Sequence, residues 1–300
     1  MSSSAEIKPV TSNEEAVDLL TSFLDRTTIK ADEPAATKPK PLESKSPGSN
    51  YTFVDSREAL SDAIDGLVDL PSSPPSLYVD LEGNNLSRHG TVSILQIHVR
   101  TTGHTYLIDV LILGPLAFST PGILHAETTL KSILESDKIP KVFFDVRNDS
   151  DALYSHYDIS LSGIHDLQLM ALATRNPGQR RLITGLAKCI EKDAPLSYTE
   201  RLRLAAVKAK GTALFSPEKG GSYAVFDARP LSREIAEYCV QDTAILPRLW
   251  SHYDRQLSSV WDERVRDMSR RRVRESQSPT FNGKGRHMAL APVEWARLRD

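Results

Sequence analysis

Two acidic side chains close a short apolar segment, SLYVDLEGNN, at residues 76–85. The segment is typical of a strand, so Asp80 and Glu82 project to one face while Val79 and Leu81 project to the other. Two like charges this close repel each other, and a divalent cation would relieve the repulsion. Carboxylate oxygens are the ligands that Mg²⁺ and Mn²⁺ prefer. The same pattern also occurs at ordinary solvated strand ends, so it needs support from other residues.

A second acidic position lies in FFDVRNDSDALY, residues 143–154, where an apolar strand passes directly into a helix. Asp149 falls in the first turn of that helix, and Asp145 and Asp151 are alternatives nearby. A carboxylate at a helix start is also favoured by the helix dipole alone. The position therefore indicates a metal ligand only in combination with the first pair.

A third position lies in REIAEYCVQDTAILPRL, residues 233–249, which has the apolar spacing of a helix. Tyr238 and Asp242 are four residues apart and share one face of it. An exposed acid one turn from a half-buried tyrosine would give the same pattern. Taken with Asp80, Glu82 and Asp149, however, Asp242 completes a set of four carboxylates that a suitable fold would bring to one end of a sheet.

The elements around these residues predict an α/β fold with a mixed sheet flanked by helices and a helical C-terminal half. A helix is expected over 56–70 and another near 128–136. Three short apolar segments are expected to pair as hairpins, and a further strand leads into the helix that carries Asp149; these four segments are 77–81, 92–99, 105–110 and 141–146. From residue 167 onward the pattern is predominantly helical.

The chain divides by composition into three parts. Residues 1–50 are expected to hold a short helix over 13–26 and a disordered linker rich in Pro, Ser and Lys over 30–50. Residues 51–257 are the expected compact domain. Residues 258–300 are expected to form a basic helix and a C-terminal tail, whose apolar, Trp-bearing end could dock on the domain or on a partner.

Overall composition excludes several classes of protein. The 300 residues carry a net charge of −2, so any attraction to nucleic acid must come from local clusters, and two cysteines are too few for a disulfide framework. No apolar run reaches the length of a membrane span or of a signal peptide. We therefore expect an intracellular protein, nuclear or cytoplasmic, that is not secreted and has no membrane partner.

The acidic constellation resembles the DEDD superfamily of 3′-5′ exonucleases, which have the ribonuclease H-like fold, in the tyrosine-bearing subclass typified by ribonuclease D. Asp80 and Glu82 match the first motif, Asp149 the second, and Tyr238 with Asp242 the third. The resemblance covers roughly residues 51–257. The stretches GNNLSRHGTVSILQIHV and HDLQLMA look closest to the branch containing Egalitarian and the related 3′-5′ exonuclease domain-containing proteins.

The resemblance implies a metal-dependent 3′-5′ exonuclease that hydrolyses single-stranded or 3′-overhanging nucleic acid, RNA or DNA, with two Mg²⁺ or Mn²⁺ ions. Asp80 would bridge the two ions, and Glu82, Asp149 and Asp242 would complete their shells. The Tyr238 hydroxyl would orient the attacking water, so all five residues form the expected catalytic set. The alternative is a catalytically silent RNA-binding adaptor that keeps the fold. All five motif positions hold the expected residue types, which favours the enzyme.

Basic residues in three places are candidates for binding nucleic acid. Arg88 and His89 follow Glu82 in a turn. Lys208, Lys210 and Lys219 lie in a segment, 205–232, that is expected to be a loop-rich cover over the site. Arg270, Arg271 and Arg272 form the core of SRRRVR in the C-terminal helix, where a nuclear-import signal and a simple solvated helix end are the competing interpretations.

Overall fold

A computed structural model describes residues 50–295 of the chain. The helix predicted over 13–26 lies outside the described residues, as does the linker predicted over 30–50 up to its last residue. No helix in the described part is both long enough and apolar enough to cross a membrane.

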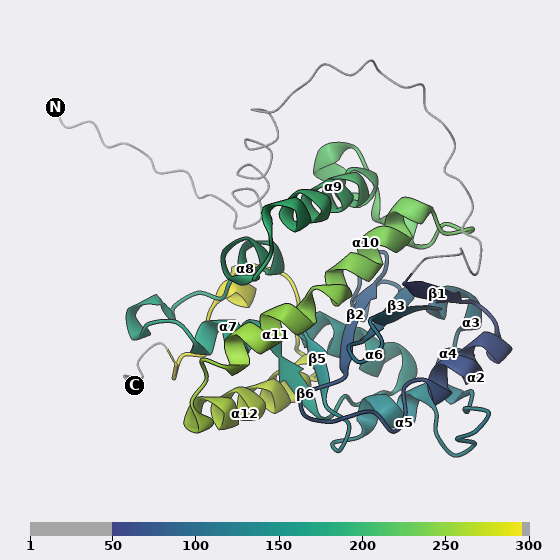
Figure 1. Cartoon of the computed structure of the whole chain (residues 1–300), viewed down its shortest axis with the longest axis horizontal. Coiled ribbons are helices and arrows are strands. Elements are labelled where there is room, and N and C mark those ends of the chain that lie inside the picture. The colour runs from purple at the N-terminus through teal and green to yellow at the C-terminus, as the bar shows by residue number, and fades with distance from the viewer. Residues whose placement is uncertain (1–49, 296–300) are drawn as a thin grey trace.

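Six strands form one mixed sheet in the order β1-β4-β3-β2-β5-β6 (Figure 1). Their bounds are β1 Tyr51–Val54, β2 Leu77–Glu82, β3 Ile94–Val99, β4 His104–Asp109, β5 Lys141–Phe143 and β6 Ile164–Asp166. The strands β2, β3 and β4 pair antiparallel, as the predicted hairpins require. The strands β5 and β6 add in parallel beyond β2, and β1 adds in parallel beyond β4. The predicted fold class is therefore confirmed.

Helices cover both faces of this sheet. Their bounds are α2 Arg57–Asp65, α3 Val110–Leu113, α4 Leu116–Ser119, α5 Leu130–Glu135, α6 Arg147–Tyr157, α7 Leu167–Ala173, α8 Leu186–Asp193, α9 Tyr198–Phe215, α10 Arg233–Ala244, α11 Leu246–Asp254 and α12 Ser259–Ser276. Four short 3₁₀ turns accompany them: η1 Pro177–Gln179, η2 Pro217–Lys219, η3 Tyr223–Phe226 and η4 Arg286–Ala289. In Figure 1 the helices α10 and α11 run diagonally across the sheet.

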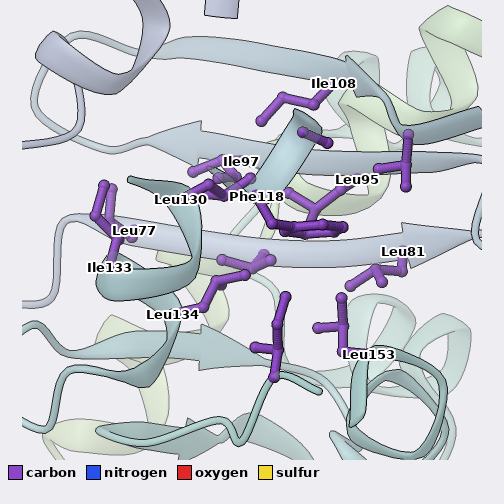
Figure 2. Packing of buried hydrophobic residues seen from close by; sticks show 14 of the residues in the cluster. Leu77, Leu81, Leu95, Ile97, Ile108, Phe118, Leu130, Ile133, Leu134 and Leu153 are labelled. Atoms are coloured by element: carbon purple, nitrogen blue, oxygen red, sulfur yellow. The ribbon is translucent and has the colours of Figure 1, made fainter. Parts of the chain in front are cut away.

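Successive side chains of β2 point alternately into the hydrophobic core and toward the face that carries the acidic residues. Leu77, Val79 and Leu81 are buried in a cluster with residues of α2, α4, α5 and α6 on one face of the sheet. Figure 2 shows this packing, with Leu77 of β2 beside Ile133 and Leu81 near Leu153. Asp80 and Glu82 point to the other face, where α7, α10, α11 and α12 pack. The aliphatic face thus fixes the register that presents the carboxylates.

Five of the six strands run in one direction, so the carboxyl ends of β2, β4, β5 and β6 meet at one edge of the sheet. Acidic residues lie at or just beyond each of these ends: Glu82, Asp109, Asp145 and Asp166. Ligands bind preferentially at such an edge in α/β proteins. The edge is defined here as the carboxyl edge.

The structure corrects several sequence-based expectations. The strands β1 and β6 were not expected, because each has only three or four residues and lacks a periodic pattern of its own. The segment expected as a loop-rich cover over 205–232 begins instead as the last turns of α9, which continues through Gly211 to Phe215. Lys208 and Lys210 therefore lie on a helix rather than in a loop.

The residues after α12 pack back against the domain. Arg147 donates a 2.8 Å hydrogen bond to the carbonyl of Met288, and Ile183 and Leu182 pair with the backbone of Ala289 and Leu290. Trp295 is buried with its ring edge-to-face on Trp261, at 5.2 Å between centroids. The C-terminal tail was expected to dock on the domain or on a partner, and its described part docks on the domain.

An ion pair beneath the carboxyl edge joins α12 to β6. The guanidinium of Arg272 lies 2.7 Å from the Asp166 carboxylate, and the two side chains are 5% and 0% exposed. The same carboxylate accepts hydrogen bonds from the backbone N–H groups of Asp145 and Val146, in the turn that leads to Asp149. Arg272 is thereby a buried structural residue, which corrects its expected role as a phosphate ligand on an exposed basic stretch.

Replacing Arg272 with Met should destabilise the protein by about 3 kcal/mol, because the Asp166 carboxylate would stay buried without its cation. That loss corresponds to a fall in Tm of roughly 6–12 °C for a domain of this size. Thermal unfolding followed by circular dichroism measures it. The matched control is Arg270→Met, since Arg270 is 61% exposed and, among the residues that the structure describes, forms its one ion pair with Asp267 at the surface. Equal Tm values for the two variants would contradict the structural role of Arg272.

Candidate active site

Three elements bring the motif carboxylates together at the carboxyl edge. Asp80 and Glu82 lie at the carboxyl end of strand β2. Asp149 lies in the first turn of α6, directly after β5, and Asp242 lies on α10, which crosses this face of the sheet. The arrangement follows from topology, because β5 is the parallel neighbour of β2 and the turn after it ends beside Glu82. Asp149 and Asp242 are buried, and Asp80 and Glu82 are half-buried.

Burial and mutual repulsion raise the pKa values of three of these carboxylates. Burial raises the pKa of Asp80 to about 7, with a further contribution from the charge of Asp242. Burial also raises the pKa of Glu82, followed by the charges of Asp80, Asp242 and Asp149. The pKa of Asp149 is raised by burial and then by the charge of Asp80. The four carboxylates thus form one electrostatic unit, in which Asp80, Glu82 and Asp149 have no paired cation within residues 50–295.

Arginine pairing distinguishes this unit from the other acids of the carboxyl edge. The pairs, with their shortest N–O distances, are Arg88–Asp151 at 2.6 Å, Arg147–Asp145 at 2.6 Å, Arg229–Asp109 at 2.5 Å and Arg272–Asp166 at 2.7 Å. Within residues 50–295, Asp80, Glu82 and Asp149 pair with no lysine or arginine. Asp145 and Asp151, the sequence-based alternatives to Asp149, are therefore neutralised, and Asp149 is the acid that remains without a counter-charge.

Tyr238 faces the same unit from α10. Burial raises the pKa of its hydroxyl, and the charges of Asp242 and Glu82 raise it further, so the hydroxyl keeps its proton at neutral pH. Gly211 of α9 lies against the ring, where a Cβ atom would come within 2.7 Å of the Tyr238 Cβ. Phe215 contacts the ring at 5.1 Å between centroids. The close approach of α9, which only glycine permits, holds Tyr238 in place.

Lys208 reaches from α9 to the one motif acid that has a cationic partner. Its Nζ lies 3.2 and 3.3 Å from the two carboxylate oxygens of Asp242 and 5.5 Å from the centre of the Tyr238 ring. The Lys208 side chain is 27% exposed and the Asp242 side chain 6%. An ammonium group therefore occupies part of the space around Asp242 where a bound cation would have to lie.

The donor set has the chemistry of a magnesium or manganese site, because all four groups are carboxylates, and burial and neighbouring charges raise the pKa of Asp80, Glu82 and Asp149. The side chains are not yet arranged as a closed site. Within the described residues, no three Asp, Glu, His or Cys side chains lie close enough together to hold one ion as they stand. Closing a site at Asp242 requires Lys208 to move away from its carboxylate.

The approach of α10 to the sheet is fixed by the segment before it. The Arg229 guanidinium donates to both oxygens of Asp109 at 2.5 and 2.7 Å. Asp227 accepts hydrogen bonds from Ser93 and, at 3.1 Å, from Thr91 at the start of β3. These contacts anchor the entry to α10 on β3 and β4, and so place Tyr238 and Asp242 opposite Asp80. Sequence analysis did not detect this anchor.

Comparison with known proteins was made for the whole chain. Residues 51–258 match the family model described as a 3'-5' exonuclease. The chain belongs to the 3'-5' exonuclease family. No curated protein matches significantly.

Solved structures share the exonuclease fold at low sequence identity. Ribonuclease D of Trypanosoma brucei in complex with GMP matches with a TM-score of 0.63 and 21% identity, over 82% of this chain and 70% of that chain. The complex of the same organism's ribonuclease D with RNA U12 matches with a TM-score of 0.62 and 20% identity, over 82% and 77%. The catalytic core of RRP6 from Trypanosoma brucei matches with a TM-score of 0.52 and 18% identity, over 79% and 55%.

The remaining basic candidates lie in different environments on this exonuclease. Arg88 directs its guanidinium to Asp151 and to the carbonyls of Ser276 and Ser278 at 2.8 Å, so its donors are used within the fold. His89, Lys210 and Lys219 are exposed. Arg270 and Arg271 are exposed on α12 and pair with Asp267, Glu275 and Glu294. Of the eight candidates, Lys208 is the one that contacts a motif carboxylate.

Metal-free exonuclease should lose stability as the pH rises from about 4 to about 7. The raised pKa means that folded Asp80 holds its proton up to about pH 7, whereas the unfolded chain releases it near pH 4, so folding becomes less favourable across this window. The Asp80→Asn variant should escape the penalty.

In EDTA at pH 8 the Tm of Asp80→Asn should therefore exceed that of the unaltered chain by about 3 °C or more, since each tenfold change in proton affinity is worth about 1.4 kcal/mol. The gap should shrink toward pH 4. Differential scanning calorimetry across this range measures it. Asp62→Asn, at an exposed position of α2, is the matched control and should show no such gap. A pH-independent gap for Asp80→Asn would contradict the repulsion.

Replacing Lys208 with Met should strengthen Mn²⁺ binding by about threefold or more, because it removes a competing cation from Asp242 while keeping the length of the side chain. The measurement is the Mn²⁺ concentration that gives half of the maximal rise in Tm. Lys210→Met is the control, since Lys210 is exposed on the same helix. If Mn²⁺ affinity falls in Lys208→Met, the ammonium supports the bound ion rather than competing with it.

Proposed function

We propose that this exonuclease removes nucleotides one at a time from the 3′ end of single-stranded or 3′-overhanging nucleic acid, using divalent cations bound by Asp80, Glu82, Asp149 and Asp242. The observation that carries the proposal is the group of four carboxylates at the carboxyl edge, in which burial and neighbouring charges raise the pKa of Asp80, Glu82 and Asp149. Such a group is costly unless cations join it. The nearby acids Asp109, Asp145, Asp151 and Asp166 are each paired with an arginine.

The reaction needs a water oxygen to bond to phosphorus while the bond from phosphorus to the 3′ oxygen breaks. The products are a nucleoside 5′-monophosphate and a strand shortened by one residue, whose 3′ oxygen takes a proton. Mg²⁺ or Mn²⁺ at the four carboxylates would lower the pKa of the water and stabilise charge on the attacking and leaving oxygens.

The chain's own groups would position the reactants. The Tyr238 hydroxyl keeps its proton, which supports a role as a hydrogen-bond donor that orients the water or a phosphate oxygen rather than a role as a base. Asp80, which is half-buried between Glu82 and Asp242, is the residue best situated to be shared between two ions. Lys208, once displaced from Asp242, would lie near the negative charge of the scissile phosphate.

One observation favours a second function, that of an RNA-binding adaptor without catalytic activity. Lys208 supplies Asp242 with a cation from the chain itself, so the fold tolerates that carboxylate without a metal. Both proposals have nucleic acid as partner. The ribonuclease D complex with RNA U12 is the neighbour that supports this partner, at the level of the shared fold.

The decisive experiment follows 5′-labelled single-stranded RNA and DNA with the purified protein in Mn²⁺, Mg²⁺ or EDTA. We expect a ladder that shortens from the 3′ end and requires metal. The double variant Asp80→Asn, Glu82→Gln should be slower by at least about a hundredfold, since metal-ion stabilisation of the transition state is worth several kcal/mol.

Two controls sharpen the result. Asp62→Asn removes an exposed carboxylate and should leave the rate unchanged. A circular RNA has no 3′ end and should stay intact. Intact linear substrate in every lane, together with a gel shift of the RNA by folded protein, would reject the exonuclease proposal and support the adaptor.

A further inference from the structure

A pocket of about 290 Å³ lies between the loop after β2 and the C-terminal segment. One wall is the loop Asn85–His89, the floor includes Asn148 of α6, and the other wall is the segment Phe281–Lys284. We name the feature formed by these residues the arm pocket. Its size is at the lower end of ordinary ligand pockets, which suits a single base or nucleotide.

Two residues that line the arm pocket lie close along the chain to motif carboxylates. Asn85 follows Glu82 by three residues, and Asn148 immediately precedes Asp149. The wall Phe281–Lys284 lies beyond residues 51–258, the part of the chain that matches the family model. The pocket is thus formed jointly by residues inside and outside the segment that the family model matches.

A single arginine joins the two walls. Arg88 donates to Asp151 through its backbone N–H at 2.9 Å and through Nε at 2.6 Å. Its terminal nitrogens donate to the carbonyls of Ser276, Ser278 and Pro279, and its guanidinium lies 6.0 Å from the centre of the Phe281 ring. These contacts hold the loop and the C-terminal segment at a fixed separation. The pocket is therefore preformed.

The lining combines three kinds of group that bind a nucleotide. Phe281 supplies an aromatic ring, on which a base can stack. The Asn148 Oδ1 atom is buried and has no hydrogen-bond partner among the described residues, which is costly unless a ligand or water supplies a donor. Lys284 is exposed, and its ammonium contacts the neutral amide oxygen of Asn85, so its charge remains available for a phosphate.

We propose that the arm pocket binds one nucleotide of the substrate strand upstream of its 3′ end. The base lies against Phe281, an amino or imino group of the base donates to Asn148, and the phosphate pairs with Lys284. The inference rests on the proposed function, since it places a second nucleotide subsite next to the catalytic carboxylates. It gives the C-terminal segment a role in holding the strand.

A substitution at Gly283 should block the pocket while keeping the side chains that are proposed to contact the nucleotide. A Cβ atom added at Gly283 would lie 2.1 Å from Asn148 Oδ1, so Gly283→Ala must displace the Asn148 side chain. Gly178→Ala is the matched control, because a Cβ atom there meets nothing within 4 Å. Lys138→Ala controls for the loss of one exposed positive charge at the opposite edge of the sheet.

The test is the affinity for a short 5′-fluorescein-labelled single-stranded RNA, measured by fluorescence anisotropy in EDTA so that the strand stays intact. The double variant Phe281→Ala, Lys284→Ala should bind roughly fivefold or more weakly, and Gly283→Ala should also lose affinity. Gly178→Ala and Lys138→Ala should bind as the unaltered chain does. The Mn²⁺-induced rise in Tm, measured for each variant, should stay unchanged.

Equal affinity of the unaltered chain and both pocket variants would overturn the arm pocket as a subsite while leaving the exonuclease proposal intact. The same holds if Gly178→Ala loses as much affinity as Gly283→Ala. Absence of binding by the unaltered chain would overturn the subsite whatever the cleavage assay gives. Shortening of RNA in that assay is the separate readout for the proposed function.

Discussion

The repulsion among four carboxylates at one edge of the sheet is the constraint on which the rest of this structure depends. Asp80, Glu82, Asp149 and Asp242 come from β2, α6 and α10, and burial together with their shared charge raises the pKa of the first three. A fold can carry such a group only if the surrounding scaffold resists its separation. Here the scaffold is the aliphatic core on the opposite face of β2, which fixes the register, and the anchor of Arg229 on Asp109, which fixes the approach of α10.

Arginine pairing separates the acids that stabilise the carboxyl edge from the acids that are available to bind a cation. Asp109, Asp145, Asp151 and Asp166 each have a guanidinium within hydrogen-bonding distance, and three of these four pairs tie together elements that are far apart in sequence. Lys208 differs from these arginines, because its single ammonium on a flexible side chain can move away from Asp242 without breaking a bidentate contact. The site therefore combines rigid neutralised neighbours with one cation that is free to leave.

The sequence was sufficient for the fold class, since the alternating strands and the strand-to-helix passage before Asp149 are local patterns. It was also sufficient to put Tyr238 and Asp242 on one helix face. It was not sufficient for Arg272, because three consecutive arginines look alike until the packing of α12 buries one of them against Asp166. Residues 198–210 have a helical pattern, but the sequence was not sufficient for the continuation of α9 to Phe215. Gly211 is typical of a loop, and the reason for it, the closeness of Tyr238, involves residues distant along the chain.

The burial of Arg272 also bears on how the limits of this protein are defined. The family model matches residues 51–258, yet α12 begins only after that point and supplies the partner of a fully buried carboxylate in β6. A chain shortened to the matched residues would keep every motif acid and still lack a part of its interior. Part of the interior of the described fold is thus supplied by residues beyond the segment that the family model matches.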